Sequence, residues 1–458
     1  MTSRRLFLGA AACVLALAGC ASAPSPQELP PPIVFVHGNG DHAGLWQTTI
    51  WRFESNGWPR DRLYAIDHPY PLARDDDTKA QPGRSSTAEH MAYLRAEVEK
   101  VLQATGSRQV VLMGNSRGGN AIRNYIQNGG GDKTVSHAIL GGTPNHGVQA
   151  IPGVNEANEF SGTGPFLRSL NAPKNAAGDE VTGPVKWLTI RSDSNDKFAQ
   201  PDGLWVGMRG KPTNVTFEGP ALKGATNVVI PRIDHRETAF SPAAFDAAYR
   251  FITGRAPATT AVTPEDRVVL SGKVTGQGAS STDPASGNGF NNLALPGAQL
   301  QVFSIDPNTG ERQGPAFYAK TIAADGAWGP FAVPPGARLE FAVAAPGYAT
   351  THFYRSPFPR SSNVVNLRAE RIPADDRNAP ALAIMVRARG YLDPGRDKMA
   401  FDGQSPPPGA VLGAGVASSR VKPTGLPRAI TGEFNGERVI GRTWPAANNE
   451  LTILELTY

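Results

Sequence analysis

Cysteine is almost absent from this chain of 458 residues. Its two cysteines, Cys13 and Cys20, both lie among the first twenty residues. The remainder can therefore form no disulfide, and it offers no thiol nucleophile and no cysteine-built metal site. Beyond residue 20 no apolar run reaches membrane-spanning length. The 45 Lys and Arg residues, against 40 Asp and Glu, are spread without a basic block, so nothing in the charge pattern indicates nucleic-acid binding.

The first 32 residues are interpreted as a processing segment and a tether rather than as part of the fold. The run Ser3-Arg4-Arg5-Leu6-Phe7-Leu8 resembles a twin-arginine export signal, and residues 10–17 form a short apolar core behind it. Leu17-Ala18-Gly19-Cys20 resembles the lipobox of bacterial lipoproteins, in which the cysteine carries the lipid. We therefore predict a signal peptide at 1–19, lipidation of Cys20 and a Pro/Ser-rich tether at 20–32. The predicted location is the cell envelope, with Ala21 favouring the outer membrane by analogy; the alternative is a plain secretory peptide.

The most informative stretch lies at residues 110–119. An apolar run of strand length ends at Gly114, and Ser116 and Gly118 follow. Apolar residues then recur at helical spacing, at Ala121, Ile122, Tyr125 and Ile126. A serine between glycines at a strand-to-helix turn is the pattern of a nucleophile elbow. The alternative is an ordinary glycine-rich turn.

Around this elbow, short apolar runs alternate with amphipathic helical patterns, which predicts a doubly wound, mostly parallel α/β sheet at 33–255. Strands are expected at 33–36, 63–66, 110–113, 138–140, 187–190 and 228–230, and helices after the capping box at Ser86 and after Ser241-Pro242. A Pro/Thr-rich linker at 256–265 follows. Alternating strand patterns then predict a β-sandwich at 266–370 and a second β-unit at 371–458. At 458 residues, more than one domain is expected.

A serine nucleophile needs a base and an acid that orients the base. His235 follows the last predicted strand of the α/β region and is our candidate base. Asp196 and Asp193 both follow the preceding strand, which gives the chain order Ser, Asp, His. We prefer Asp196, with Asp193 as the open alternative. The backbone N–H groups of Arg117 and Asn39 are predicted to hold the oxyanion, which leaves their side chains free to vary.

Four motifs in order resemble the α/β-hydrolase lipases and esterases. They are His37-Gly38-Asn39-Gly40, Gly114-Asn115-Ser116-Arg117-Gly118, Thr143-Pro144-Asn145-His146-Gly147 and His235 before the last helix. The resemblance covers about residues 31–255 and is closest to bacterial triacylglycerol lipases, where the histidine at the place of His146 is not the base. It implies hydrolysis of carboxylic esters through an acyl-enzyme, with no cofactor and no metal. Some microbial lipases also carry a C-terminal β-domain that helps to bind long acyl chains.

Two other segments carry expectations of their own. Residues 295–298, 324–329 and 345–348 resemble a carboxypeptidase-regulatory-like, transthyretin-like β-sandwich, which implies no chemistry. Residues 151–183, with Phe160, Phe166 and Leu167, lie where lids occur in the α/β-hydrolase fold. A structural helix pair is the alternative for this segment.

The sequence therefore predicts an exported serine esterase that acts on hydrophobic esters, associated with the membrane through a lipid on Cys20. One alternative is an extracellular depolymerase of aliphatic polyesters. The other is a surface-binding protein that has kept a hydrolase fold without activity. No feature of the sequence indicates an oligomeric state.

Overall fold

The computed structural model describes residues 29–208, 210–277 and 290–458. The predictions for the signal peptide at 1–19 and for Cys20 lie outside the described residues. The chain divides into two compact units, Met1–Pro30 and Pro31–Tyr458, and the second contains all of the strands and helices described. None of the helices in the described part is both long enough and apolar enough to cross a bilayer.

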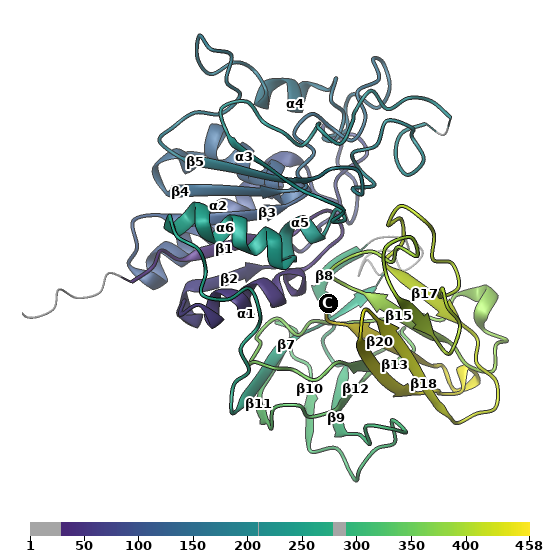
Figure 1. The fold of residues 1–458 in the computed structure, drawn as a ribbon. Coiled ribbons are helices and arrows are strands. Elements are labelled where there is room, and N and C mark those ends of the chain that lie inside the picture. Colours follow the sequence, from purple (N-terminus) through teal and green to yellow (C-terminus); the bar gives the residue numbers. More distant parts are fainter. Residues whose placement is uncertain (1–28, 209, 278–289) are drawn as a thin grey trace, which may run out of the picture. The chain divides into compact units, whose positions relative to one another are not determined.

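A six-stranded parallel sheet forms the centre of the α/β region, as predicted (Figure 1). Its strands lie in the order β2-β1-β3-β4-β5-β6. Their bounds are β1 Ile33–Val36, β2 Leu63–Ile66, β3 Val110–Asn115, β4 Val135–Gly141, β5 Lys186–Ser192 and β6 Thr226–Ile230. In a parallel sheet the carboxyl ends of the strands meet at one edge, so the loops that follow β1, β3, β5 and β6 are brought together there.

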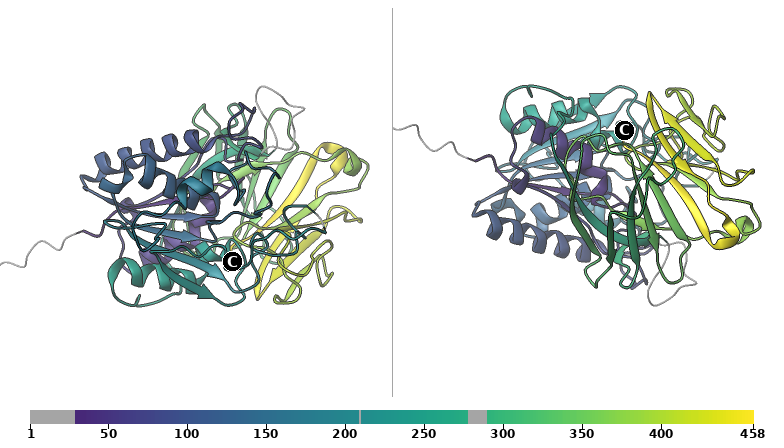
Figure 2. Two further views of the ribbon diagram at one scale, coloured as in Figure 1. Left: turned by 90° about the horizontal axis from the view of Figure 1, so that it is seen from above. Right: turned by 90° about the horizontal axis from the view of Figure 1, so that it is seen from below.

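Helices cover both faces of this sheet (Figure 2). Helices α2 (Thr87–Thr105) and α3 (Arg117–Asn128) pack on the face that presents Val34, Val36 and Leu112. Helices α1 (Gln47–Ser55) and α6 (Pro242–Thr253) pack on the opposite face, with Phe35 and Met113. The shorter helices are α4 (Pro165–Leu170) and α5 (Glu237–Phe240). Because alternate strand residues point to opposite faces, the continuous apolar strands serve both cores.

The helix boundaries follow from local chemistry that the sequence already displays. Helix α2 begins with a complete capping box, in which the Ser86 hydroxyl accepts from the Glu89 N–H and the Glu89 carboxylate accepts from the Ser86 N–H. It ends at Gly106, whose φ of 64° is left-handed. Helix α6 begins with the Ser241 hydroxyl accepting from the Ala244 N–H, and Pro242 occupies its first turn.

The described part of the chain after residue 266 contains strands, loops and two short 3-10 helices, Ala374–Asp376 and Ala446–Asn448, and no α-helix. A seven-stranded sheet has the order β10-β9-β12-β13-β20-β15-β17, and β11-β7-β14 with β8 on β7, and β16-β18-β19, form two smaller sheets. Their bounds are β7 Val268–Gln277, β8 Phe290–Ala294, β9 Gln299–Ser304, β10 Tyr318–Thr321, β11 Ala327–Val333, β12 Leu339–Ala344, β13 Thr350–Arg355, β14 Leu367–Ala369, β15 Ala383–Arg387, β16 Met399–Phe401, β17 Ser418–Val421, β18 Ala429–Phe434, β19 Glu437–Arg442 and β20 Glu450–Leu456.

The expected division between 266–370 and 371–458 does not separate two sheets. Strand β20, from the end of the chain, pairs in parallel with β13 on one side and β15 on the other. Both predicted units therefore contribute strands to the same seven-stranded sheet. The reason is pairing between strands that are distant in sequence, which local alternation patterns do not reveal.

The α/β region (residues 33–255) and the β-region (residues 266–458) exchange core residues. Trp51 of α1 packs in the core of the β-region, and its indole N–H donates to the Ser361 carbonyl at 2.8 Å. Val364, from the β-region, packs in a core of the α/β region. The predicted linker at 256–265 is bound to the α/β region, because the Asn56 side chain forms two hydrogen bonds with the Thr259 backbone.

Candidate active site

The turn between β3 and α3 places Ser116 in a strained backbone conformation, with φ 54° and ψ −122°. Glycines permit this turn. A Cβ at Gly118 would lie 2.4 Å from the Val36 carbonyl oxygen, and one at Gly114 would lie 2.7 Å from the Gly119 nitrogen. A positive φ at a non-glycine residue persists only when the surrounding structure enforces it, and such strain concentrates at functional sites. The geometry is that of a nucleophile elbow.

Ser116 and His235 line the same cavity, which has a volume of about 170 Å³. Apolar side chains form much of the remaining wall. The lining residues are Gly38, Asn39, Asp41, Asn115, Ser116, Val148, Phe160, Phe198, Val206, His235, Arg236 and Tyr391. The cavity therefore combines a hydroxyl and an imidazole with a largely apolar wall, in the manner of small-molecule sites.

The structure brings Asp196, rather than Asp193, to His235. The Nδ1 atom of His235 lies 2.9 Å from the Asp196 carboxylate, and both side chains are buried. The Phe198 N–H donates to the same carboxylate at 2.9 Å, and the Phe198 ring meets the imidazole edge-on. Asp193 instead accepts from the backbone N–H groups of Ser194 and Arg232, of which the Arg232 bond is the main cause that lowers the pKa of Asp193.

Asn115, to which the sequence analysis gave no role, connects the elbow to the loop that carries His235 (the histidine loop). Asn115, directly before Ser116, is 1 % exposed. Its side-chain amide donates to the His235 carbonyl at 3.1 Å, to the Gly141 carbonyl at 3.1 Å and to the Thr238 hydroxyl at 3.2 Å. The only signal in the sequence is a polar residue at the buried end of an apolar strand.

The two candidate oxyanion residues lie beside the site, and the structure corrects our expectation about their side chains. Asn39 lines the cavity, and its side-chain oxygen accepts from the Ala73 N–H at 2.8 Å. The Arg117 guanidinium is fully buried and binds the Glu159 carboxylate through Nε at 3.0 Å and a terminal nitrogen at 2.7 Å. It also donates to the Ser85 hydroxyl at 2.9 Å. A buried guanidinium with these partners is not free to vary.

Two other motif histidines have partners of their own. His37 donates from Nδ1 to the Gly38 carbonyl and accepts from the His68 N–H at Nε2, while burial lowers its pKa. His146 has its Nδ1 2.7 Å from the Gly219 carbonyl and its Nε2 2.8 Å from Glu180. The hydrogen bond to Glu180 is the main cause that raises the pKa of His146. Both contacts are those of a structural histidine.

Residues 151–183 border the cavity but do not form a helix pair. They contain one short helix, α4, and otherwise turns. Phe160 lines the cavity, and Leu167 is fully buried. The ion pair between Glu159 and Arg117 fastens this segment directly to the residue after Ser116.

The β-region also reaches the cavity, through a contact between segments that are distant in the sequence. Tyr391 is part of its lining. The guanidinium of Arg236, next to His235, lies over the Tyr391 ring at 5.1 Å and pairs with Asp41 at 3.1 Å. A second cavity of about 830 Å³ between the α/β loops and the seven-stranded sheet shares Asn39, Asp41 and Arg236 with the first.

Comparison with known families agrees with this architecture. Residues 30–179 match the family described as lipase (class 2), and residues 266–372 match the lipase C-terminal domain. The fold and the matched regions together identify an α/β-hydrolase of the lipase and carboxylesterase class, which is a class of serine ester hydrolases. The class 2 lipase match contains the elbow and Asn39, while Asp196 and His235 lie beyond it.

Individual proteins resemble parts of the chain. A non-heme haloperoxidase of Rhodococcus erythropolis is 26% identical over 116 residues, which cover 25% of this chain and 37% of that protein. The lipase BlEst2 of Bacillus licheniformis in its mature form shows 21% identity and a TM-score of 0.36, over 50% of this chain and 95% of that one. The phospholipase PlaB of Legionella pneumophila shows 12% identity and a TM-score of 0.33, over 74% and 94%. Because these TM-scores are low, the classification rests on the two family models.

Proposed function

We propose that the protein hydrolyses hydrophobic carboxylic esters, with Ser116 as the nucleophile, His235 as the base and Asp196 as the residue that orients the base. One observation carries the proposal. The pair formed by Asp196 and His235 opens onto the same cavity as a serine on a strained elbow. These are the parts of a serine hydrolase, which are recognised by their geometry and roles.

In the proposed reaction, the Ser116 hydroxyl oxygen attacks the ester carbonyl carbon, and its proton passes to Nε2 of His235. Asp196 accepts the hydrogen bond from Nδ1, which orients the imidazole and stabilises the imidazolium. The oxyanion takes hydrogen bonds from the backbone N–H groups of Arg117 and Asn39. Collapse of this intermediate releases the alcohol, which receives the proton from His235. Water then attacks the carbonyl carbon of the acyl-enzyme, with His235 again as the base, and the acid is released as Ser116 takes back the proton.

The wall of the cavity supports an apolar ester. Val148, Phe160, Phe198 and Val206 would contact the acyl or alcohol part of the substrate. A cavity of about 170 Å³ would hold the reacting group and a short chain, and the adjoining cavity of about 830 Å³ offers room for a larger remainder. Soluble esters, emulsified acylglycerols and aliphatic polyester films would separate an esterase from a lipase and from a depolymerase.

The direct test is hydrolysis of p-nitrophenyl esters of increasing acyl length by the full chain without its signal peptide, beside Ser116→Ala. We expect turnover in the parent protein, loss of about 10³-fold or more in the variant, and a single phosphonate adduct on Ser116. A folded parent protein with no turnover and no adduct would leave the non-catalytic binding protein as the better account. Circular dichroism of both proteins controls for folding.

We also propose that the protein is exported and held at the membrane by a lipid on Cys20. The support is the sequence alone, namely the twin-arginine run and the lipobox-like Leu17-Ala18-Gly19-Cys20. Expression of the full-length chain in a bacterial host, beside Cys20→Ser, provides the test. The parent should fractionate with membranes and carry an acyl mass on its first residue, and the variant should be soluble or retained as precursor. Equal fractionation without added mass would contradict the proposal.

A further inference from the structure

The loop that carries His235 is held by one buried carboxylate. Asp234, immediately before the histidine, is fully buried. One of its oxygens accepts from the backbone N–H groups of Arg236 and Glu237, each at 2.9 Å, which fixes the turn around His235. Its other oxygen accepts from Arg387 and from the Tyr391 backbone N–H, each at 2.8 Å. Half of these bonds therefore come from the β-region.

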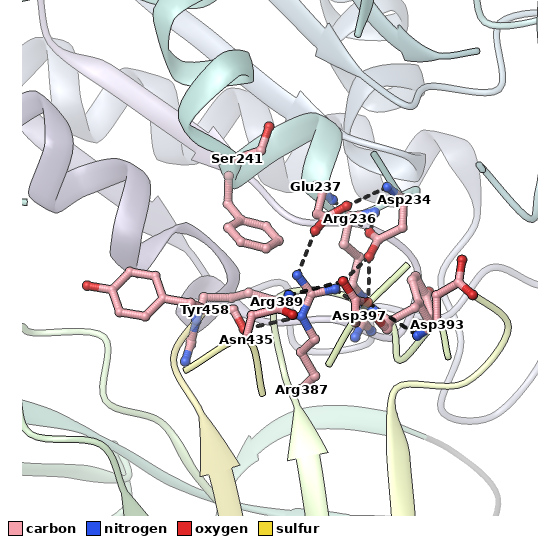
Figure 3. Close-up of polar contacts among 12 residues, drawn as sticks. Asp234, Arg236, Glu237, Ser241, Arg387, Arg389, Asp393, Asp397, Asn435 and Tyr458 are labelled. Atoms are coloured by element: carbon pink, nitrogen blue, oxygen red, sulfur yellow. Dashed lines mark hydrogen bonds and ion pairs between the residues drawn. The ribbon is translucent and has the colours of Figure 1, made fainter. Parts of the chain in front are cut away.

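Arg387, at the end of strand β15, bridges the carboxylates on either side of the histidine (Figure 3). One terminal nitrogen binds Asp234 at 2.8 Å, and the other binds Glu237 at 2.6 Å. The Arg387 side chain is only 4 % exposed. Arg396 adds a second contact to Glu237 at 2.6 Å. A guanidinium suits this task because its fixed fork of donors can hold two carboxylates in one geometry.

The loop that carries Asp196 is held by the same part of the β-region. The ammonium group of Lys197, the next residue, donates to the Gly415 carbonyl at 2.8 Å and lies 4.1 Å from the centre of the Tyr391 ring. Burial is the main cause that lowers the pKa of Lys197 to about 8. Trp205 packs so closely on Gly415 that a Cβ there would lie 2.0 Å from the indole. Residues 387–415 therefore contact both loops whose side chains meet in the Asp196–His235 pair.

We propose that Arg387 is a positioning residue for His235, and that the β-region is a working part of the active site rather than an accessory module. The inference rests on the proposed function, because it assumes that His235 is the base. Arg387 is absent from the residues that line the Ser116 cavity, so it acts through Asp234 and Glu237. Its effect is to fix the imidazole relative to Ser116 and Asp196, and a displacement of about 1 Å in such an arrangement can cost about 10²-fold in rate.

The test compares Arg387→Ala and Arg387→Lys with the parent protein, and uses Arg312→Ala as the matched control. Arg312 belongs to the β-region and forms a two-point ion pair with the buried carboxylate of Glu340, at 2.9 and 2.6 Å. Its removal therefore takes a guanidinium away from a buried carboxylate of the β-region that does not contact the loop carrying His235. For each protein we would measure kcat and KM on a p-nitrophenyl ester, the rate of phosphonate labelling of Ser116, and the thermal midpoint.

For Arg387→Ala we expect kcat and the labelling rate to fall by about 10²-fold, with KM within about twofold of the parent. Arg387→Lys should give an intermediate loss, because an ammonium cannot hold both carboxylates in the same fork geometry. Arg312→Ala should keep the parent kcat even where its thermal midpoint falls. If Arg387→Ala does not fold, Arg387→Lys decides the question.

A folded Arg387 variant with the parent kcat would overturn the inference and leave the proposed function intact. An equal loss of kcat in Arg312→Ala would also overturn it, because the effect would then be general destabilisation. Failure of the proposed function is recognised separately, since the parent protein itself would then show neither turnover nor a Ser116 adduct.

Discussion

At the scale of single residues, the two carboxylates after strand β5 differ in what they bind. Asp196 meets the His235 imidazole, whereas Asp193 binds backbone N–H groups of the loops around it. We expect Asp196→Asn to lower kcat by about 10⁴-fold, because an amide neither holds the required tautomer nor stabilises the imidazolium. Asp193→Asn, the matched control, should change kcat by less than about tenfold. Steady-state kinetics on one soluble ester measure both, and similar losses in the two variants would contradict the assignment.

Arg117 offers a second prediction at this scale, about stability. Arg117→Ala leaves the buried carboxylate of Glu159 without its partner, which typically costs about 3–5 kcal/mol. Urea unfolding, followed by circular dichroism, measures the free energy. Because the cost arises from the orphaned charge, the double variant Arg117→Ala with Glu159→Gln should recover part of it. Strictly additive effects in this double-mutant cycle would show that the ion pair is not the cause.

From the sequence we predicted Ser116 and His235 and two candidate acids, because the elbow, the strand order and the loop position are local patterns. Asn115, Asp234 and the buried side chain of Arg117 were missed. Their roles depend on hydrogen bonds between segments that are distant in the chain. Arg117 and Glu159 are 42 positions apart, Asn115 and His235 are 120 apart, and Asp234 and Arg387 are 153 apart. Such pairings follow from the assembled fold, and no spacing rule within one segment contains them.

At the scale of elements, the parallel strands and their helices were predictable and the β-region was only partly so. Strands β1 and β2 have the expected bounds, and α2 lies between the capping box and Gly106 as expected. Their signals are continuous apolar runs and end caps, both of which are local. The pairing of β20 with β13 and β15 was not foreseen, since a period-2 pattern states which face is buried but not which strand lies alongside.

Glu370, directly after strand β14, gives a prediction about pH. Burial raises its pKa from about 4.5 to about 7, against the opposing effect of Arg368. The pKa of Glu370 is therefore higher in the folded protein than in the unfolded chain. Because of this difference, the protonated Glu370 carboxyl contributes its full stabilisation below pH 4.5, and this contribution is lost as pH rises through 7. That difference corresponds to about 3 kcal/mol. Relative to Glu370→Gln, which cannot ionise, the parent protein should lose stability over this range.

The measurement for Glu370 is the free energy of unfolding from urea titrations at several pH values between 4 and 8, for the parent and for Glu370→Gln. Groups that titrate in both proteins cancel in the difference between the two curves. The difference should change by about 3 kcal/mol across the range. Parallel curves would mean that Glu370 ionises in the folded protein as readily as in water.

At the scale of the whole molecule, the α/β region and the β-region share structural elements. Trp51 and Val364 each pack in the core of the other region, and Asp234 in the histidine loop is bound by Arg387. Regions joined by exchanged core residues and buried ion pairs should not unfold independently, in contrast to domains connected by a free linker. The fold therefore predicts a single cooperative unfolding unit for residues 31–458.

Trp51→Ala tests this coupling. Removing a buried tryptophan typically costs about 3–5 kcal/mol, and here the cavity would open in the core of the β-region although the residue belongs to α1. Native-state hydrogen exchange gives separate opening free energies for amides of β3 and of β12. If the regions unfold together, the opening free energies of the β3 amides and of the β12 amides should fall by the same amount in the variant. Trp328→Ala, in the core of the β-region, is the matched control and should also lower both sets equally. A fall in opening free energy confined to the β12 amides in either variant would show that the β-region opens alone. Its contacts with the loop that carries His235 would then break during each opening.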